Sequence, residues 1–199
     1  MLALAVVSAV LLVAGAVTVP LLMRGGSDGA GTDGTGTGTD DDAEAPTLAD
    51  VRVFEQPTTR HVSGEVDYDQ APPTGGDHDP AWLECGVYDV PVREENAVHS
   101  LEHGTVWVAY EPGVDEDSID ALAEALPAES ILSPYDGLRV PVVVTVWGRQ
   151  LALTGAQDPR LALFLAEYAD GNTAPEPFAS CAGGVRRTDD SNDDDSASV

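Results

Sequence analysis

The sequence contains no lysine, and all nine of its basic residues are arginine. Aspartate and glutamate together number 35, so the formal net charge at pH 7 is -26. A surface this acidic repels the phosphates of nucleic acids and the headgroups of anionic lipids. We therefore expect no nucleic-acid partner for this chain.

Sulfur-containing residues are equally scarce. The only methionines, Met1 and Met23, lie before the expected folded domain, which excludes a methionine-rich copper carrier. The two cysteines, Cys85 and Cys181, are too far apart to form a Cys-x-x-Cys redox motif. A glycine-rich phosphate loop and a Ser-His-Asp order are also missing, so these two routes to catalysis are excluded.

A long apolar run at the N-terminus is the first positive feature. Residues 2–23 carry no charge, and at roughly 1.5 Å per residue they are long enough to cross a hydrocarbon core of ~30 Å. The alternative is a cleaved signal peptide, whose apolar region is typically shorter, about 7–15 residues, and follows a basic stretch. Residues 1–24 are therefore predicted to form an uncleaved transmembrane anchor.

Composition divides the rest of the chain into three parts. Residues 25–50 are mostly Gly, Thr and Asp, and residues 185–199 are rich in Asp, so neither segment has enough apolar surface to fold. Residues 51–184 are predicted to form one globular domain. Arg24, beside the apolar run, mildly favours a cytoplasmic domain, whereas the acidic flank and the cysteine pair favour the outside of the cell.

Within this domain the pattern of apolar residues predicts a mixture of helices and strands. Helices are expected at 96–103, 115–126 and 158–168, and strands at 51–54, 61–68, 105–110, 131–135, 140–147 and 150–153. Proline and glycine punctuate residues 71–86, which we expect to be a long loop. This order predicts an α+β fold, with helices packed on one face of a mainly antiparallel sheet.

The four histidines all fall between residues 61 and 103 and predict a metal site. His99 and His103 are four residues apart, so on a helix they share one face. With His78 from the preceding loop they supply three ligands for zinc or copper, and Glu102 and His61 are second-shell or alternative ligands. The competing interpretation is that the histidines are buried and hydrogen-bonded, with Glu102 fixing a tautomer.

The segment His99-Ser-Leu-Glu-His103 also matches the inverted zinc-protease motif His-x-x-Glu-His. In that motif the histidines hold zinc and the glutamate, here Glu102, activates water. Such an enzyme needs a further carboxylate ligand, for which Glu167 and Glu176 are candidates. A metal-dependent hydrolase is therefore an alternative to a non-catalytic metal-binding module.

Cys85 and Cys181 are the candidates for a disulfide, which is the usual state of a cysteine pair in an exported domain. The alternative is that Cys85 ligates a metal as a thiolate beside His78. Trp82 and Tyr88 flank Cys85 and either line a ligand pocket or belong to the core.

Several uncommon motifs occur in order along the chain. They are HVSGEVDY, PPTGGDH, CGVY, VHSLEHG, SPYDGL, WGRQL and CAGG. Together these motifs resemble the uncharacterised bacterial family called domain of unknown function 3105, over about residues 50–184. The resemblance implies a single-pass, membrane-anchored domain outside the cytoplasm and implies no reaction. We therefore expect an extracytoplasmic ligand- or metal-binding domain, with a purely structural or interaction role as a further alternative and no indication of its protein partners.

Overall fold

The structure is a computed structural model that describes residues 45–56, 58–177 and 179–186. The predicted anchor, most of the predicted linker and nearly all of the predicted tail lie outside these residues. Among the described helices, none has the length and apolar character needed to span a bilayer.

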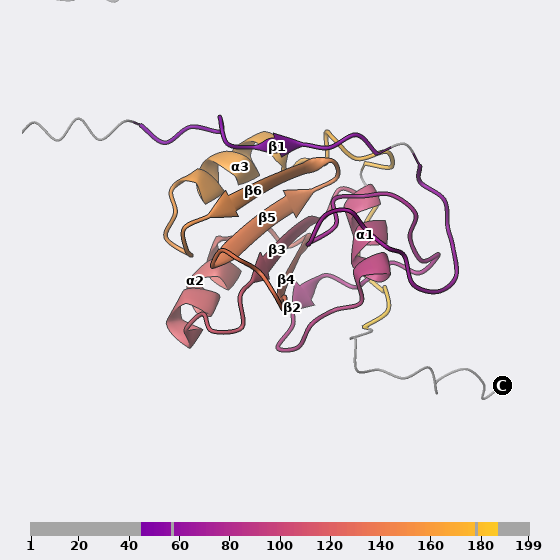
Figure 1. Ribbon diagram of the computed structural model, residues 1–199, viewed down its shortest axis with the longest axis horizontal. Helices are drawn as coiled ribbons and strands as arrows, with labels where there is room; N and C mark the ends of the chain where they lie inside the picture. The colour runs from indigo at the N-terminus through magenta and orange to yellow at the C-terminus, as the bar shows by residue number, and fades with distance from the viewer. Residues whose placement is uncertain (1–44, 57, 178, 187–199) are drawn as a thin grey trace, which may run out of the picture. The chain divides into compact units, whose positions relative to one another are not determined.

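Three helices and six strands follow one another along the described chain (Figure 1). In order they are β1 (Arg52–Val53), β2 (Gly86–Val87), α1 (Glu94–Glu102), β3 (Val106–Tyr110), α2 (Glu116–Ala125), β4 (Ser130–Pro134), β5 (Val142–Val146), β6 (Arg149–Leu153) and α3 (Arg160–Tyr168). The predicted α+β class is confirmed. The helix and strand on either side of Gly104 lie where the sequence placed them.

The strands form one sheet in the order β1-β6-β5-β3-β4-β2. Strands β2 and β3 each pair parallel with β4, whereas the β3–β5, β5–β6 and β6–β1 pairs are antiparallel. The prediction of a mainly antiparallel sheet was therefore wrong, and the sheet is mixed. The reason lies in the connections, because a helix between two strands is the usual crossover that makes them parallel.

The helices cover both faces of the sheet, so the prediction that they share one face was also wrong. Alternate residues of β3 belong to different cores: Val106 packs with Leu122 of α2 and Phe164 of α3, whereas Trp107 packs with Leu101 of α1. The connection from β2 to β3 passes over β4 and runs toward the β1 edge of the sheet. The connection from β3 to β4 runs in the opposite direction, toward the β2 edge. Right-handed crossovers in opposite directions place α1 and α2 on opposite faces.

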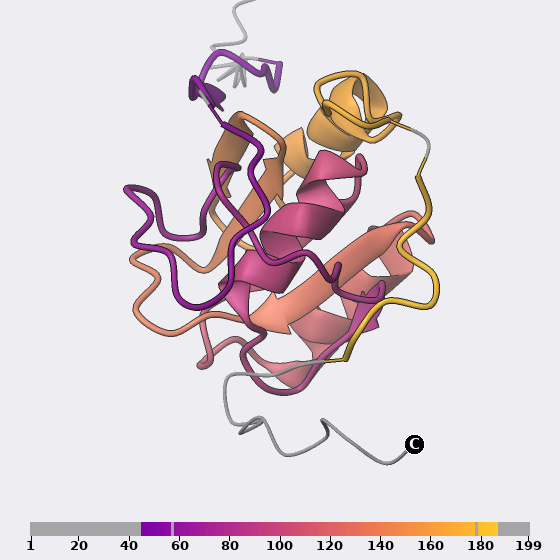
Figure 2. The same cartoon turned by 90° about the vertical axis from the view of Figure 1, so that its right-hand side faces the viewer.

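Residues 61–68 are not the strand that their alternation predicted. Only His61 makes a β-bridge, with His78. Side chains near α1 take the place of a partner strand here: Glu95 accepts a hydrogen bond from the Val66 amide at 2.8 Å, and Arg93 donates one to the Gly64 carbonyl at 3.0 Å. This segment and the loop after it wrap the outer side of α1 (Figure 2).

Cys85 and Cys181 form a disulfide with Cα atoms 5.4 Å apart, a normal separation for such a bond. Beyond Cys181 the chain runs beside the segment that precedes β2, where the Val185 amide and the Trp82 carbonyl are 2.9 Å apart. The C-terminal end of the domain is thereby tied to the layer that covers α1.

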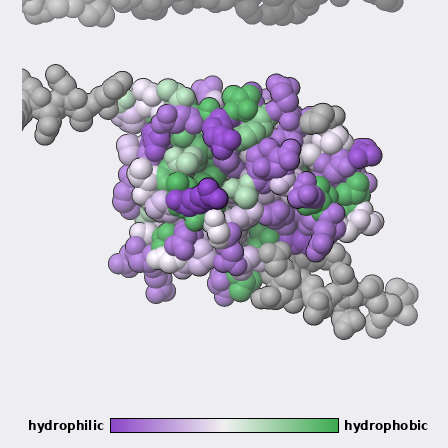
Figure 3. Space-filling model, in the orientation of Figure 1, coloured by the Kyte–Doolittle hydropathy of each residue, from purple (hydrophilic) through white to green (hydrophobic). Residues whose placement is uncertain are grey.

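The surface seen in Figure 3 is covered largely by hydrophilic residues, with small apolar patches between them. Among the described residues, the exposed large apolar side chains are Val53, Val87 and Leu163. They lie on three different elements, β1, β2 and α3, so they form no single apolar face.

Candidate metal centre

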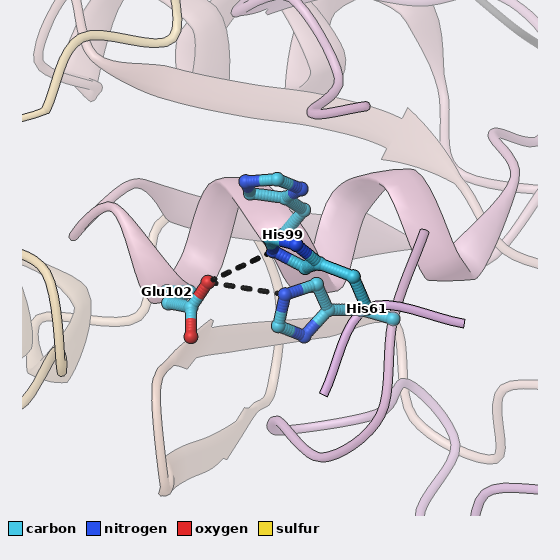
Figure 4. A group of neighbouring side chains, drawn as sticks. His61, His99 and Glu102 are labelled. Carbon is cyan, nitrogen blue, oxygen red and sulfur yellow. Dashed lines mark ion pairs between the residues drawn. The ribbon is translucent and has the colours of Figure 1, made fainter. Parts of the chain in front are cut away.

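Four side chains bring potential metal-binding atoms together on the outer side of α1. The imidazoles of His61, His78 and His99 and the carboxylate of Glu102 each place one donor atom within 4.8 Å of all the others. Figure 4 shows His61 and His99 beside Glu102, with His61 reaching in from a neighbouring segment. Three of the four residues are buried and His61 is exposed.

Helix α1 supplies two of these groups because His99 and Glu102 are three residues apart and therefore share a face. The helix ends at Glu102, and His103 is its C-cap. Gly104 follows with φ of 95°, a conformation that glycine adopts without strain and that commonly ends a helix. The helix end thus fixes which side chains of the VHSLEHG segment point into the centre.

Backbone pairing brings His61 and His78 together. The Val62 amide donates to the His78 carbonyl at 2.7 Å, and the His78 amide donates to the Arg60 carbonyl at 3.0 Å. This short bridge holds two distant segments in register, so their imidazole centroids are 4.9 Å apart.

Hydrogen bonds to backbone carbonyls set the tautomers of the two buried imidazoles. Nδ1 of His78 lies 2.8 Å from the Gly76 carbonyl, and Nδ1 of His99 lies 2.7 Å from the Asp79 carbonyl. A carbonyl oxygen only accepts, so each Nδ1 carries a proton, and in the neutral form of each ring Nε2 is the nitrogen with the lone pair. This arrangement is the usual support for a metal-binding histidine.

The distances within the group suit a metal ion. Oε2 of Glu102 is 3.0 Å from Nε2 of His78 and 3.9 Å from Nε2 of His61. Two donors of a tetrahedral zinc site lie about 3.4 Å apart, given zinc–ligand bonds of about 2.0–2.1 Å. The contact between His78 and Glu102 is not aligned as a hydrogen bond, and the buried Nε2 of His78 has no hydrogen-bond partner among the described residues.

Burial also keeps His99 uncharged. Burial is the main reason why the pKa of His99 falls to about 4; the hydrogen bond to Asp79 raises the pKa and the neighbouring imidazoles lower it, and this value includes both effects. A neutral imidazole is the form that binds metal ions, so His99 is in the binding form at neutral pH.

His103 lies outside the group of four. Its ring packs against His99 and Trp82, with centroid distances of 4.7 and 5.5 Å, and its Nε2 is 3.9 Å from Glu176. Burial lowers the pKa of His103 as well. On its other side His103 lines a cavity of about 180 Å³, together with Glu129 and Asp170.

Trp82 and Tyr88, which were predicted to line a ligand pocket, lie in different parts of the structure. Trp82 lies against the imidazoles of His99 and His103 and so covers one side of the centre. Tyr88 is buried in the core on the α1 side and donates a hydrogen bond to the Glu84 carbonyl. Cys85 is held in the disulfide beside Glu129, so it has no thiolate to offer beside His78.

Two backbone groups that orient the imidazoles were not anticipated from the sequence. The carbonyls of Gly76 and Asp79 carry no residue-specific sign of their role. The sequence feature closest to these carbonyls is the pair Gly75-Gly76. Both glycines have positive φ, a conformation that lets the loop turn back toward His78.

The family described as "Protein of unknown function (DUF3105)" matches residues 61–183 of the chain. This span contains all four residues of the centre and both cysteines. Comparison with curated proteins found no match, and comparison with solved structures found none.

Proposed function

The chain belongs to the DUF3105 family, whose description assigns no function, and we propose that it is a metal-binding module that holds one zinc or copper(II) ion. The ligands are Nε2 of His61, His78 and His99 and the carboxylate of Glu102. The observation that carries this proposal is the convergence of available Nε2 atoms on a buried carboxylate.

A purely structural role for the histidines accounts less well for the same geometry. Buried polar atoms in proteins nearly always have hydrogen-bond partners. The Nδ1 of His78 is bound to the Gly76 carbonyl, and its buried Nε2, which has no hydrogen-bond partner among the described residues, lies 3.0 Å from Oε2 of Glu102 at the centre. A metal ion among the four donors would satisfy this atom and compensate the charge of Glu102.

The donor set also narrows the choice of metal. Three imidazole nitrogens and one carboxylate oxygen suit zinc and copper(II). Sulfur ligands would favour copper(I), but the cysteines are in the disulfide and the methionines precede the described domain.

A zinc protease of the His-x-x-Glu-His type receives no support from this geometry. That mechanism requires His99 and His103 to bind the same ion. Here His103 faces Trp82 and Glu176 instead, and Glu102 is itself one of the grouped donors. We therefore do not assign a hydrolytic reaction.

The module is proposed to lie outside the cytoplasm, anchored by residues 1–24. The apolar run and the disulfide support this location, because disulfides persist in oxidising compartments. A C-terminal reporter enzyme that is active only outside the cytoplasm tests it, and activity of the opposite, cytoplasmic reporter would contradict it.

Metal content of the full-length chain, purified without a histidine tag, tests the binding function. We expect close to one zinc or copper ion per chain by mass spectrometry, loss of the ion in His99→Ala, and retention in His103→Ala. His103 is the matched control because it neighbours His99 but lies outside the donor group. No bound metal after incubation with zinc and copper(II), or equal loss in both folded variants, would contradict the proposal.

A further inference from the structure

The four proposed ligands differ sharply in their access to water. The side chains of His78 and Glu102 are 0% and 4% exposed, whereas that of His61 is 51% exposed. His61 therefore occupies the solvent-facing side of the centre, and the other ligands form its buried floor.

The ligands also differ in how firmly they are held. His78 and His99 each use their second ring nitrogen to hydrogen-bond a backbone carbonyl, and Glu102 lies in a buried turn of α1. Among the described residues the His61 ring has no hydrogen-bond partner, and it contacts His78 and His99 through ring packing alone. Its backbone is fixed by the bridge to His78, and its Nε2 lies 3.9 Å from Oε2 of Glu102, farther than the 3.0 Å of His78.

We propose that His61 is the exchangeable ligand of this centre, and that the metal ion enters and leaves on the His61 side. This inference rests on the proposed metal-binding function. In the exchange, the bond between the ion and Nε2 of His61 breaks, and a bond to an incoming neutral nitrogen or oxygen donor forms. The oxidation state of the ion and the number of bound protons do not change.

The charge of the chain fits a role in exchanging a cation. With a net charge of -26 and no lysine, the protein raises the local concentration of divalent cations and disfavours anionic substrates. A site with three fixed donors and one displaceable donor retains its ion until another donor replaces His61. Such a site suits transfer of a metal ion to an acceptor.

The test compares metal release from the full-length chain and from His61→Ala, with His103→Ala as the matched control. Zinc is loaded, and its transfer to a coloured chelator is followed by stopped flow. We expect His61→Ala to bind zinc but to release it about tenfold faster or more, which is the lower end of effects typical of residues supporting metal sites. Added imidazole should restore slow release in His61→Ala, because it fills the open position.

Four other outcomes have defined meanings. If His61→Ala releases zinc as the unmodified chain does, or if it binds zinc but imidazole leaves its fast release unchanged, the exchange proposal is wrong and metal binding stands. If His61→Ala stays folded but loses zinc as completely as His99→Ala, His61 is a fixed ligand and the exchange proposal is again wrong. If the unmodified chain binds no metal, both proposals are overturned.

Discussion

Glu102 carries the only negative charge among the four donors, and it is buried. Burying a carboxylate without a compensating positive charge is unfavourable. The imidazoles of His78 and His61 lie nearest, with their Nε2 atoms 3.0 and 3.9 Å from Oε2 of Glu102. In our proposal a metal ion supplies positive charge beside this carboxylate.

Glu102→Gln keeps the shape of the side chain and removes its charge. We expect affinity for zinc to fall by about tenfold or more, while the metal-free protein keeps its stability because the shape of the side chain is unchanged and a buried charge is removed. Zinc titration and thermal unfolding measure the two effects. Glu176→Gln, an exposed change near His103, is the control and should leave zinc affinity unaltered; a similar loss in both variants would point to a general charge effect.

Asp158 is a second buried carboxylate, and it has a clear partner. Its Oδ2 accepts hydrogen bonds from the Arg160 guanidinium at 2.6 Å and the Thr154 amide at 2.9 Å. The hydrogen bond from Arg160 is the main reason why the pKa of Asp158 lies well below its usual range. A lowered folded-state pKa means that this group stabilises the fold above its unfolded pKa, and that the contribution is lost as the pH falls through the folded pKa.

Asp158→Asn should therefore lower the free energy of unfolding at pH 7 by about 1.5–3 kcal/mol, the range for hydrogen bonds to charged groups. The difference from the unmodified chain should shrink as the pH falls below about 4, the unfolded pKa of aspartate. Urea unfolding across this pH range measures it. Asp120→Asn, exposed on α2, is the control, and a pH-independent difference for Asp158→Asn would contradict the electrostatic explanation.

At the level of elements, α1 is held by a strap, defined as residues 79–84. Polar side chains of α1 bind alternate carbonyls of the strap: His99 binds that of Asp79, Asn96 that of Ala81 at 2.6 Å, and Ser100 that of Leu83 at 2.7 Å. These three polar side chains of α1 are therefore hydrogen-bonded to the strap. The same contacts that fix the strap orient the imidazole of His99.

The end of α1 depends on Gly104. A Cβ atom at this position would lie 3.0 Å from the Cα of Gly171, and φ is +95°. Gly137 has a similar φ of +79° but open space around it. Gly137→Ala should cost about 1–2 kcal/mol from backbone conformation alone. Gly104→Ala should cost more, since the backbone of residue 171 must move.

Urea unfolding of the two alanine variants tests this difference. Both positions have positive φ, so both alanine variants carry the cost of that backbone conformation. The difference between their free energies of unfolding therefore reports the contact with residue 171. Equal losses of stability would show that the contact between residues 104 and 171 relaxes without cost.

Helices and strands were predicted best from the sequence where a local pattern of residues was enough to define them. The helix before Gly104 and the strand 105–110 were recognisable from a helix stop and a run of β-branched and aromatic residues, and the structure confirms both. The segment 61–68 was mispredicted because its alternation is local, whereas a strand also needs a partner. Sheet direction was mispredicted because crossovers, and not composition, decide which strands run parallel.

The candidate centre was predictable in part for the same reason. Spacing placed His99 and Glu102 on one face of a helix, and the structure gathers both with His78 and His61. Spacing also placed His103 on that face, but the helix ends at Glu102. A periodicity argument does not locate the last turn closely enough to decide which of two neighbouring side chains faces the centre.

At the scale of the whole molecule, the disulfide joins residues separated by 96 positions. Closing so long a loop restricts the unfolded chain, and loss of a native disulfide typically costs about 2–5 kcal/mol. The double substitution Cys85→Ser and Cys181→Ser should lower the free energy of unfolding by this amount in urea titration. Reductant should bring the unmodified chain to the same midpoint and leave the double variant unchanged; equal stability without reductant would contradict the expectation.

The sheet also acts as a partition between two compartments of the molecule. On one side Val106 and its neighbours pack against α2 and α3, and on the other Trp107 packs against Leu101 of α1, the helix that carries His99 and Glu102. The first compartment has an apolar cluster of its own that includes none of the donors, so changes among the donors do not pass through it. Substitutions among the donors on the α1 side should therefore leave the framework on the other side of the sheet unchanged.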